Sequence, residues 1–257
     1  MRSQQDAMSH QAPAEAYAAR IVLVKQQGAM RTGTNLVKFA LEENFTNVRV
    51  LVNIGRWKHA PADTPFTWNG ENWETPGHTL DVSTRITPAE LRTVRAAVDA
   101  GAMRYAISVR NVYSWLASYL RFEHWYDDPP LAELSDLDDE EIIAAVRQWN
   151  LLYRSYLELL SNEHGCMLFR LEDLHAAFGE TLDSSRLLWG LQRRHLSYVE
   201  PQRYLRAGID GEMRSQLLES ASFDKSSHPG ELPGSVLDLV RNTVDEDVVR
   251  AYGYQVA

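Results

Sequence analysis

Apolar residues along the chain follow two kinds of spacing, which predict an alternation of strands and helices. Short apolar runs rich in β-branched residues predict buried strands at 21–24, 48–54, 103–109 and 166–171. Apolar residues three or four positions apart predict helices that begin at 34 and 112 and that cover 88–100, 138–163, 182–191 and 235–251. Because strands alternate with helices, we expect one α/β domain over residues 20–257, with a mostly parallel central sheet flanked by helices.

The first strand runs directly into a glycine-containing loop and then into a helix. Gly28 follows the strand, and the helical spacing begins at Thr34. Free N–H groups at such a helix N-terminus converge on one point, where the helix dipole adds partial positive charge. This arrangement predicts a binding site for a phosphate-like anion. The alternative is an ordinary strand-to-helix turn that needs glycine only for its positive φ angles.

The loop has the glycine spacing of a nucleotide-binding loop but lacks its lysine. Gly28 and Gly33 are separated as in a Walker A motif, GxxxxG, which continues with Lys and then Ser or Thr. Here Thr34 and Asn35 follow instead, and the positive charge is Arg31, within the loop. The missing lysine is the one that neutralises the β- and γ-phosphates, so the loop is not typical of one that binds ATP or GTP.

Two segments combine arginine with hydroxyl residues at defined spacings. Residues 31–35 read Arg-Thr-Gly-Thr-Asn, and Arg110, at the end of the third predicted strand, is followed eight residues later by Ser118. Together they resemble the PAPS-dependent sulfotransferases, which have a Lys/Arg-Ser/Thr-Gly-Thr-Thr loop and a strand ending in Arg before a helix with that Ser. Residues 169–174 (Phe-Arg-Leu-Glu-Asp-Leu) are similar to a third family segment, Arg-x-Glu-Asp-Leu. The chain departs from the family where Asn replaces the last Thr of the loop and where Asn111-Val112 stands for Asp/Asn-Pro.

The resemblance, which spans about residues 20–175, implies a fold like that of P-loop-containing nucleotide hydrolases. It also implies transfer of a sulfuryl group from PAPS to an acceptor hydroxyl, with PAP as the product. The residues implied for the phosphosulfate end of PAPS are Gly28, Arg31, Thr32, Gly33, Thr34 and Asn35. Arg110 and Ser118 are implied for the 3′-phosphate, and Ser114, one helical turn earlier, offers a further hydroxyl. Such a two-ended clamp suits a ligand with anionic groups at both ends.

In-line sulfuryl transfer needs cations near the bridging oxygen and a base for the acceptor hydroxyl. Arg31 matches the family's catalytic Lys/Arg position and is expected to stabilise the leaving phosphate. His59, beside Lys58, lies where several sulfotransferases present a catalytic His or Glu, and an ordinary imidazole pKa of about 6.5 suits a base at neutral pH. A surface Lys-His pair in a loop is the alternative, and His78 and His124 are further candidates.

Further aromatic and charged residues are candidates to bind the acceptor or to hold parts of the predicted site in place. The aromatic candidates are Trp57, Trp68, Trp73, Trp125 and Tyr126. Flat aromatic faces bind sugars, phenols or lipids, and our hypothesis for the acceptor is a hydroxyl on a glycan or glycolipid. The alternative is that these aromatic side chains only pack within the protein. Glu172 and Asp173 are expected to anchor loops or basic side chains. Basic residues that are candidates to complete the 3′-phosphate site are Arg193, Arg194, Arg203, Arg206 and Lys225.

Charge and composition bear on the kinds of partner, the redox compartment and the location that we expect for the protein. The net charge of −9 argues against broad nucleic-acid binding, although eight acidic residues at 127–141 account for all but one of these charges and leave room for a cationic cleft. The single cysteine, Cys166, excludes an internal disulfide and is expected to be a buried structural thiol in a reducing compartment. No apolar run approaches the ~20 residues of a membrane helix. Residues 1–19 are expected to form a flexible lead-in without a signal-peptide core, so a cytoplasmic protein is the default.

Two other functions remain open. A P-loop phosphotransferase or NTPase would need a loop lysine and an acidic residue that ends the third or fourth strand and holds Mg²⁺, whereas the third strand ends at Arg110. A non-catalytic nucleotide-binding protein on the same fold is the second alternative. No His or Cys spacing indicates metal ligands, and sulfuryl transfer needs none.

Overall fold

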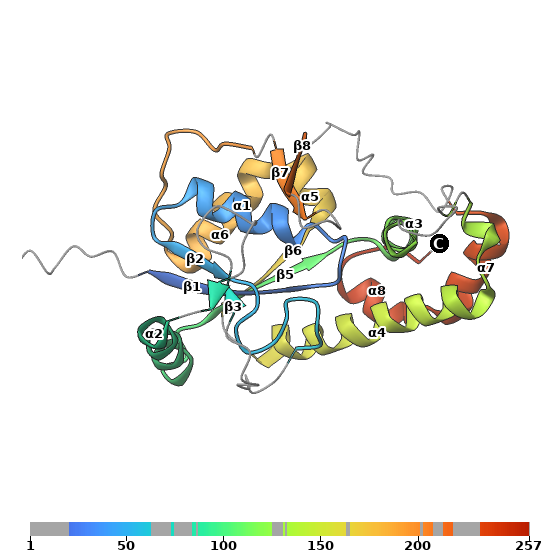
Figure 1. Cartoon of the computed structure of the whole chain (residues 1–257), viewed down its shortest axis with the longest axis horizontal. Coiled ribbons are helices and arrows are strands. Elements are labelled where there is room, and N and C mark those ends of the chain that lie inside the picture. The colour runs from blue at the N-terminus through green and yellow to red at the C-terminus, as the bar shows by residue number, and fades with distance from the viewer. Residues whose placement is uncertain are drawn as a thin grey trace, which may run out of the picture.

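The computed structural model of the chain describes residues 21–62, 87–124, 131, 133–162, 165–200 and 232–256, together with strand segments at 73–74, 84–85, 203–207 and 213–217. The predicted lead-in at 1–19 lies outside these residues. In the described part of the chain, helices cover both faces of a parallel sheet within one α/β domain (Figure 1). The prediction of a single α/β domain built on a parallel sheet is therefore confirmed.

Four parallel strands form the central sheet, in the order β2-β1-β5-β6. The strands are β1 (Val22–Gly28), β2 (Val48–Leu51), β5 (Arg104–Val109) and β6 (Cys166–Arg170). Gly28 pairs with Ser108, and Val109 pairs with Arg170, so the carboxyl ends of β1, β5 and β6 meet at one edge of the sheet. Ligands of open parallel sheets bind at this edge.

The two faces of the sheet carry separate hydrophobic cores. The helices are α1 (Thr34–Asn44), α2 (Pro88–Asp99), α3 (Val112–Glu123), α4 (Asp139–Asn162), α5 (Leu171–Ala176), α6 (Phe178–Trp189), α7 (Gly234–Thr243) and α8 (Glu246–Ala251), with a 3₁₀ turn at Leu134–Asp136. Val24 of β1 packs with residues of α1 and α6, whereas its neighbour Leu23 packs with residues of α3, α4 and α8. Figure 1 shows α1 and α6 above the sheet and α4 and α8 below it. Because successive side chains of a strand point to opposite faces, the apolar run in β1 serves both layers.

Two short antiparallel pairs of strands lie outside the sheet. They are β3 (Trp73–Glu74) with β4 (Thr84–Arg85) and β7 (Arg203–Ala207) with β8 (Met213–Leu217). No helix in the described residues combines the length and the apolar character that crossing a membrane requires.

Side-chain caps fix the starts of two helices near the positions that the sequence predicts. Thr87 and Glu90 form a reciprocal capping box at α2, with Thr87 N donating to Glu90 Oε2 at 3.0 Å and Glu90 N to Thr87 Oγ1 at 3.3 Å. Asn111 Oδ1 accepts from Tyr113 N at 3.0 Å at the start of α3. This cap sets the direction in which α3 leaves the end of β5.

Three expectations from the sequence need correction. The helix expected at 235–251 is two helices, because Val244 is extended and Asp245 starts α8 by accepting from Val248 N. The second strand was expected to reach residue 54 but ends at Leu51, after which the chain bends. Cys166 is half-buried rather than buried, and its thiol donates to Leu159 O.

Candidate functional site

Residues 28–34, here called the anion loop, connect β1 to α1 at the carboxyl edge of the sheet. Gly33 has a φ of 79°, and a Cβ atom there would lie 2.6 Å from Leu171 Cδ1. A Cβ atom at Gly28 would lie 2.7 Å from the Ser108 carbonyl oxygen. Gly28 is therefore required by space, because backbone blocks a side chain there, whereas Gly33 is required by its backbone angle. Arg31 has a positive φ of 67° without being glycine, a conformation that costs free energy and that is often kept at functional sites.

Side chains from several elements bind the carbonyl groups of the anion loop. These contacts are Trp115 Nε1 with Met30 O at 2.7 Å, Thr32 Oγ1 with Ala29 O at 2.6 Å, His59 Nδ1 with Gly28 O at 2.5 Å, and Gln26 Nε2 with Thr34 O. The carbonyls are thereby turned toward protein donors. The first hydrogen bond of α1 runs from Val37 N to Gly33 O, so the N–H groups of the first helical turn, at Thr34, Asn35 and Leu36, have no acceptor within the helix, as anion binding at a helix N-terminus requires.

The second predicted motif lies against the anion loop through α3. Arg110 Nε donates to Ser114 Oγ at 3.1 Å, and Arg31 Nε donates to Ser118 Oγ at 3.3 Å. The two serines are one helical turn apart and share a face of α3. The Arg31 guanidinium also lies 5.2 Å from the ring centroid of Phe122 on the same helix. The arginines of both predicted motifs therefore meet at one helix.

The segment after β2 forms another wall of this site. Lys58 Nζ donates to Asn35 Oδ1 at 2.5 Å, and Gly28 N donates to Lys58 O at 2.9 Å. Lys58 is thereby tied to the first residue of the anion loop and to Asn35, which directly follows the loop. The predicted loop residues and the predicted Lys58-His59 pair are thus neighbours in space.

The contacts of His59 define its tautomer. Because Gly28 O can only accept, the Nδ1 atom 2.5 Å away must carry the proton, which leaves Nε2 unprotonated in the neutral ring. Burial, together with the ammonium groups of Lys58 and Lys25, lowers the pKa of His59 to about 3, although the hydrogen bond with Gly28 O acts in the opposite direction. His59 is therefore neutral at pH 7, and its pKa is lower than the ordinary imidazole value of about 6.5 that we expect from the sequence.

Two of the predicted hydroxyl residues are already committed inside the protein. The Thr32 side chain is fully buried and donates within the loop. The Ser114 hydroxyl donates to Asn111 O at 3.2 Å while it accepts from Arg110. The Ser118 side chain is more exposed than that of Ser114, so it is the hydroxyl of this pair that is better placed to reach a ligand.

Glu172 anchors a loop, as the sequence predicts. Its carboxylate accepts from Asn111 N at 3.0 Å and from the Tyr254 hydroxyl at 2.7 Å, so it joins the segment that follows Arg110 to the C-terminal end of the domain. Asp173 forms an ion pair with Arg170 at 2.6 Å. Both carboxylates therefore serve as anchors, and Glu172 does so beside the candidate site.

Sequence reasoning missed two buried polar supports beneath the anion loop. Lys25 is completely buried within β1, and the hydroxyl of buried Tyr153 donates to Ser108 O at 2.9 Å and lies 3.4 Å from Ala29 N. The available signal was a lysine inside a predicted buried strand, because such a side chain needs polar partners.

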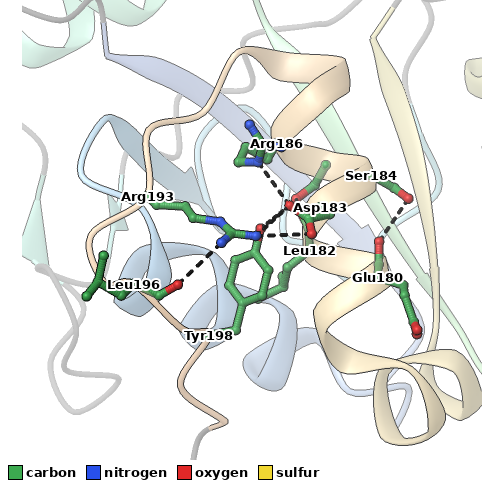
Figure 2. A network of polar contacts seen from close by, with 9 residues as sticks. Glu180, Leu182, Asp183, Ser184, Arg186, Arg193, Leu196 and Tyr198 are labelled. Atoms are coloured by element: carbon green, nitrogen blue, oxygen red, sulfur yellow. Dashed lines mark hydrogen bonds and ion pairs between the residues drawn. The ribbon is translucent and has the colours of Figure 1, made fainter.

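Two basic residues proposed for the 3′-phosphate site hold a different part of the fold. Arg193 contacts both carboxylate oxygens of Asp183 and stacks on Tyr198, with its guanidinium 4.3 Å from the ring centroid (Figure 2). Hydrogen bonds from Tyr198, Arg186 and Arg193 lower the pKa of Asp183 to about 2. Arg194 Nη2 donates to carbonyl groups at the end of α1. Both arginines therefore hold residues 191–199 on α1 and α6.

The remaining candidates divide into described and undescribed residues. His124 forms an ion pair with Glu141 and so links α3 to α4. Trp57 is 47% exposed, and its ring lies edge-on to that of His59 with centroids 4.7 Å apart. Only strand backbone is described for Trp73, Arg203 and Arg206. His78, Trp68, Trp125, Tyr126 and Lys225 lie outside the described residues.

A hollow of about 950 Å³ lies between α2 and the amino ends of the strands. Its walls include Arg49 of β2, Val94 of α2 and Arg104 of β5. It contains none of the residues predicted for the anion site, which lie at the carboxyl edge of the sheet. The contacts at the carboxyl edge, rather than this hollow, define the candidate site.

Among the described residues, no group of His, Cys, Asp or Glu side chains is arranged to hold a metal ion. The chain matches no model of a protein family, and no similar sequence is found among curated proteins.

Proposed function

We propose that this protein is a PAPS-dependent sulfotransferase with the fold of the P-loop-containing nucleotide hydrolases. The observation that carries the proposal is that Arg31 and Arg110 bind neighbouring serines on one face of α3. Two arginines from separate elements suit a ligand with two separate anionic groups, because each guanidinium can form a planar pair with one of them. PAPS is such a ligand, with a phosphosulfate and a ribose phosphate.

The residues of the site fit both ends of PAPS. The N–H groups at the start of α1, together with Arg31 and Lys58, would hold the phosphosulfate. Arg110 and Ser118 would hold the 3′-phosphate. Thr32 and Ser114 would act through their support of the loop and of Arg110, because their hydroxyls are engaged within the protein.

When bound, PAPS supplies the sulfuryl group: its sulfur leaves the bridging phosphosulfate oxygen, which keeps the electron pair in PAP, and bonds to the acceptor oxygen. Arg31 and Lys58 would stabilise the negative charge that develops on the bridging oxygen. His59 would present its unprotonated Nε2 to the acceptor hydroxyl and take its proton. The negative charge of a bound ligand would raise the pKa of His59 and so make it a stronger base.

The proposed acceptor is a hydroxyl group on a carbohydrate or glycoconjugate. Trp57 supports this choice because it is 47% exposed and its ring meets that of His59 edge-on. A sugar ring can pack on such an aromatic face while its hydroxyl lies near the imidazole.

Calorimetric titration with PAP, ADP and ATP tests the proposal. We expect PAP to bind more tightly than ADP, because only PAP carries the 3′-phosphate. Arg110→Ala should weaken PAP binding by about 2–3 kcal/mol, on the order of a hundredfold, and should remove the preference over ADP. Arg104→Ala is the matched control, since it removes an arginine from the opposite end of the same strand.

Other outcomes assign a different function. If PAP, ADP and ATP bind equally well, the proposed function becomes that of a phosphotransferase or NTPase on the same fold. Preferential binding of PAP without any release of PAP from PAPS, with water or glycans as acceptors, would indicate a non-catalytic nucleotide-binding protein.

A further inference from the structure

A lysine is completely buried in the middle of β1, three residues before the anion loop begins. The exposed fraction of Lys25 is 0%. An ammonium group in such a position is strongly disfavoured unless polar groups replace its water. Lys25 Nζ donates to Val52 O at 3.0 Å and to Arg56 O at 2.6 Å, and both carbonyls belong to the segment that follows β2.

That segment has no regular secondary structure to hold its shape. β2 ends at Leu51, and residues 52–59 form bends and a turn. Lys25 contacts the segment at two points, and Gly28 of the anion loop contacts it at Lys58 and His59. The positions of Lys58 and His59 are therefore set by contacts at both ends of the segment rather than by backbone hydrogen bonds of a strand or helix.

An apolar side chain at position 25 would fill the same space in β1 without making these contacts. It would leave the Val52 and Arg56 carbonyls without the ammonium donor, and the segment could move away from the sheet. A shift of about 1 Å in a catalytic group can cost on the order of a hundredfold in rate. Arg31 and Arg110, by contrast, bind serines of α3.

We propose that Lys25 is a positioning residue that fixes residues 52–59 and thereby directs Lys58 and His59 toward the anion loop. This inference rests on the proposed sulfotransferase function. Transfer depends on the placement of both Lys58 and His59, whereas the binding of PAP also rests on Arg31, Arg110 and the N–H groups of the anion loop. A displaced segment should therefore slow transfer more than it weakens PAP binding.

The test compares Lys25→Met with a variant at Lys38, the other lysine that is fully buried in the described part of the chain. Lys38 binds Glu42 and Val50 O, so Lys38→Met with Glu42→Gln removes a buried ammonium and its buried counter-charge without touching residues 52–59. We expect Lys25→Met to slow PAP release from PAPS, with water as the acceptor, on the order of a hundredfold while the Kd for PAP rises by much less. The control should keep both values. Lys25→Gln retains an N–H donor, should have an intermediate rate, and replaces Lys25→Met if that variant does not fold.

Two results of this comparison would overturn the inference. One is a rate for Lys25→Met equal to that of the control. The other is an equal loss of rate and of PAP affinity in both variants. Either result would make Lys25 a merely structural residue. If the wild-type protein neither binds PAP nor consumes PAPS, the proposed function fails. Amide hydrogen exchange then decides on Lys25: faster exchange in Lys25→Met confined to residues 52–59 retains its positioning role, and unchanged exchange there rejects it.

Discussion

Arg31 Nε and Ser118 Oγ lie 3.3 Å apart, although 87 positions separate the two residues in the sequence. This contact joins the anion loop to the helix that follows Arg110. A phosphosulfate bound at the loop would contact Arg31, and a phosphate bound at α3 would contact Ser118. The two ligand groups would therefore lie at opposite ends of one hydrogen bond. The occupancy of one end of the site should influence the other through this contact.

Ser118→Ala tests this contact. The substitution removes a hydroxyl that we propose to bind the 3′-phosphate, and a hydrogen bond to a charged group contributes about 1.5–3 kcal/mol. We expect the Kd for PAP to rise on the order of tenfold or more and the Kd for ADP to stay unchanged. Ser184→Ala on α6, where the hydroxyl donates to Glu180 O (Figure 2), is the matched control and should change neither. Equal weakening of PAP and ADP would assign Ser118 to the positioning of Arg31.

The positive φ angle of Arg31 predicts an unusual order of stability among its variants. Arg31→Gly and Arg31→Ala lose the same contacts with Ser118 and Phe122, but only glycine adopts a φ of 67° without strain. Left-handed backbone costs an L-residue about 1–2 kcal/mol, and the greater freedom of unfolded glycine offsets part of this. We therefore expect Arg31→Gly to exceed Arg31→Ala in free energy of unfolding by about 0.5–1 kcal/mol in urea titrations. Equal stability would show that the loop relaxes around alanine.

The parts of the fold that the sequence predicts correctly are those set by local patterns. Thr87 and Glu90 form their capping box within one turn of chain, and the apolar run of β1 identifies a buried strand. The break before α8 could not be predicted in this way. Val240, Val244 and Val248 keep helical spacing across it, and Asn150 of α4 stabilises the break by accepting from Asp245 N.

The same distinction holds for the candidate site. Spacing within each segment identified the anion loop and the pair Arg110 and Ser118, but it could not show the surroundings of His59. Its low pKa depends on burial, on Lys58 and, to a smaller extent, on Lys25, which lies far away in the sequence on β1. Arg193 was grouped with the site by charge alone, whereas its actual partner, Asp183, lies on α6.

The depressed pKa of His59 predicts a loss of stability in acid. Between pH 6.5 and about pH 3 the unfolded chain binds a proton at this residue and the folded protein does not, so lowering the pH favours unfolding. The stability advantage of the wild type over His59→Gln should be complete above pH 6.5. This advantage should shrink by about 1–2 kcal/mol at pH 4.5. The loss is smaller than two pH units of complete protonation linkage would give, because the His59 side chain is partly exposed. Urea unfolding at the two pH values measures this, and a constant difference would mean that His59 titrates normally in the folded protein.

The Glu172 carboxylate links the C-terminal end of the domain to Asn111, the residue that follows the arginine proposed for the 3′-phosphate. Tyr254→Phe removes one of its two hydrogen bonds and should lower the free energy of unfolding by about 1 kcal/mol, with PAP affinity retained. Glu172→Ala also releases Asn111 N, at the start of α3, so that Arg110 and Ser114 lose a fixed position.

For Glu172→Ala we therefore expect PAP affinity to fall on the order of tenfold in calorimetry, in addition to the loss of stability. Asp173→Ala is the matched control, because its carboxylate is the next residue but pairs with Arg170 in a half-exposed ion pair that contributes about 0–1 kcal/mol. Tighter PAP binding in Glu172→Ala would contradict the anchoring role. It would show instead that the negative charge of Glu172 opposes the ligand more than its hydrogen bond to Asn111 helps to orient Arg110.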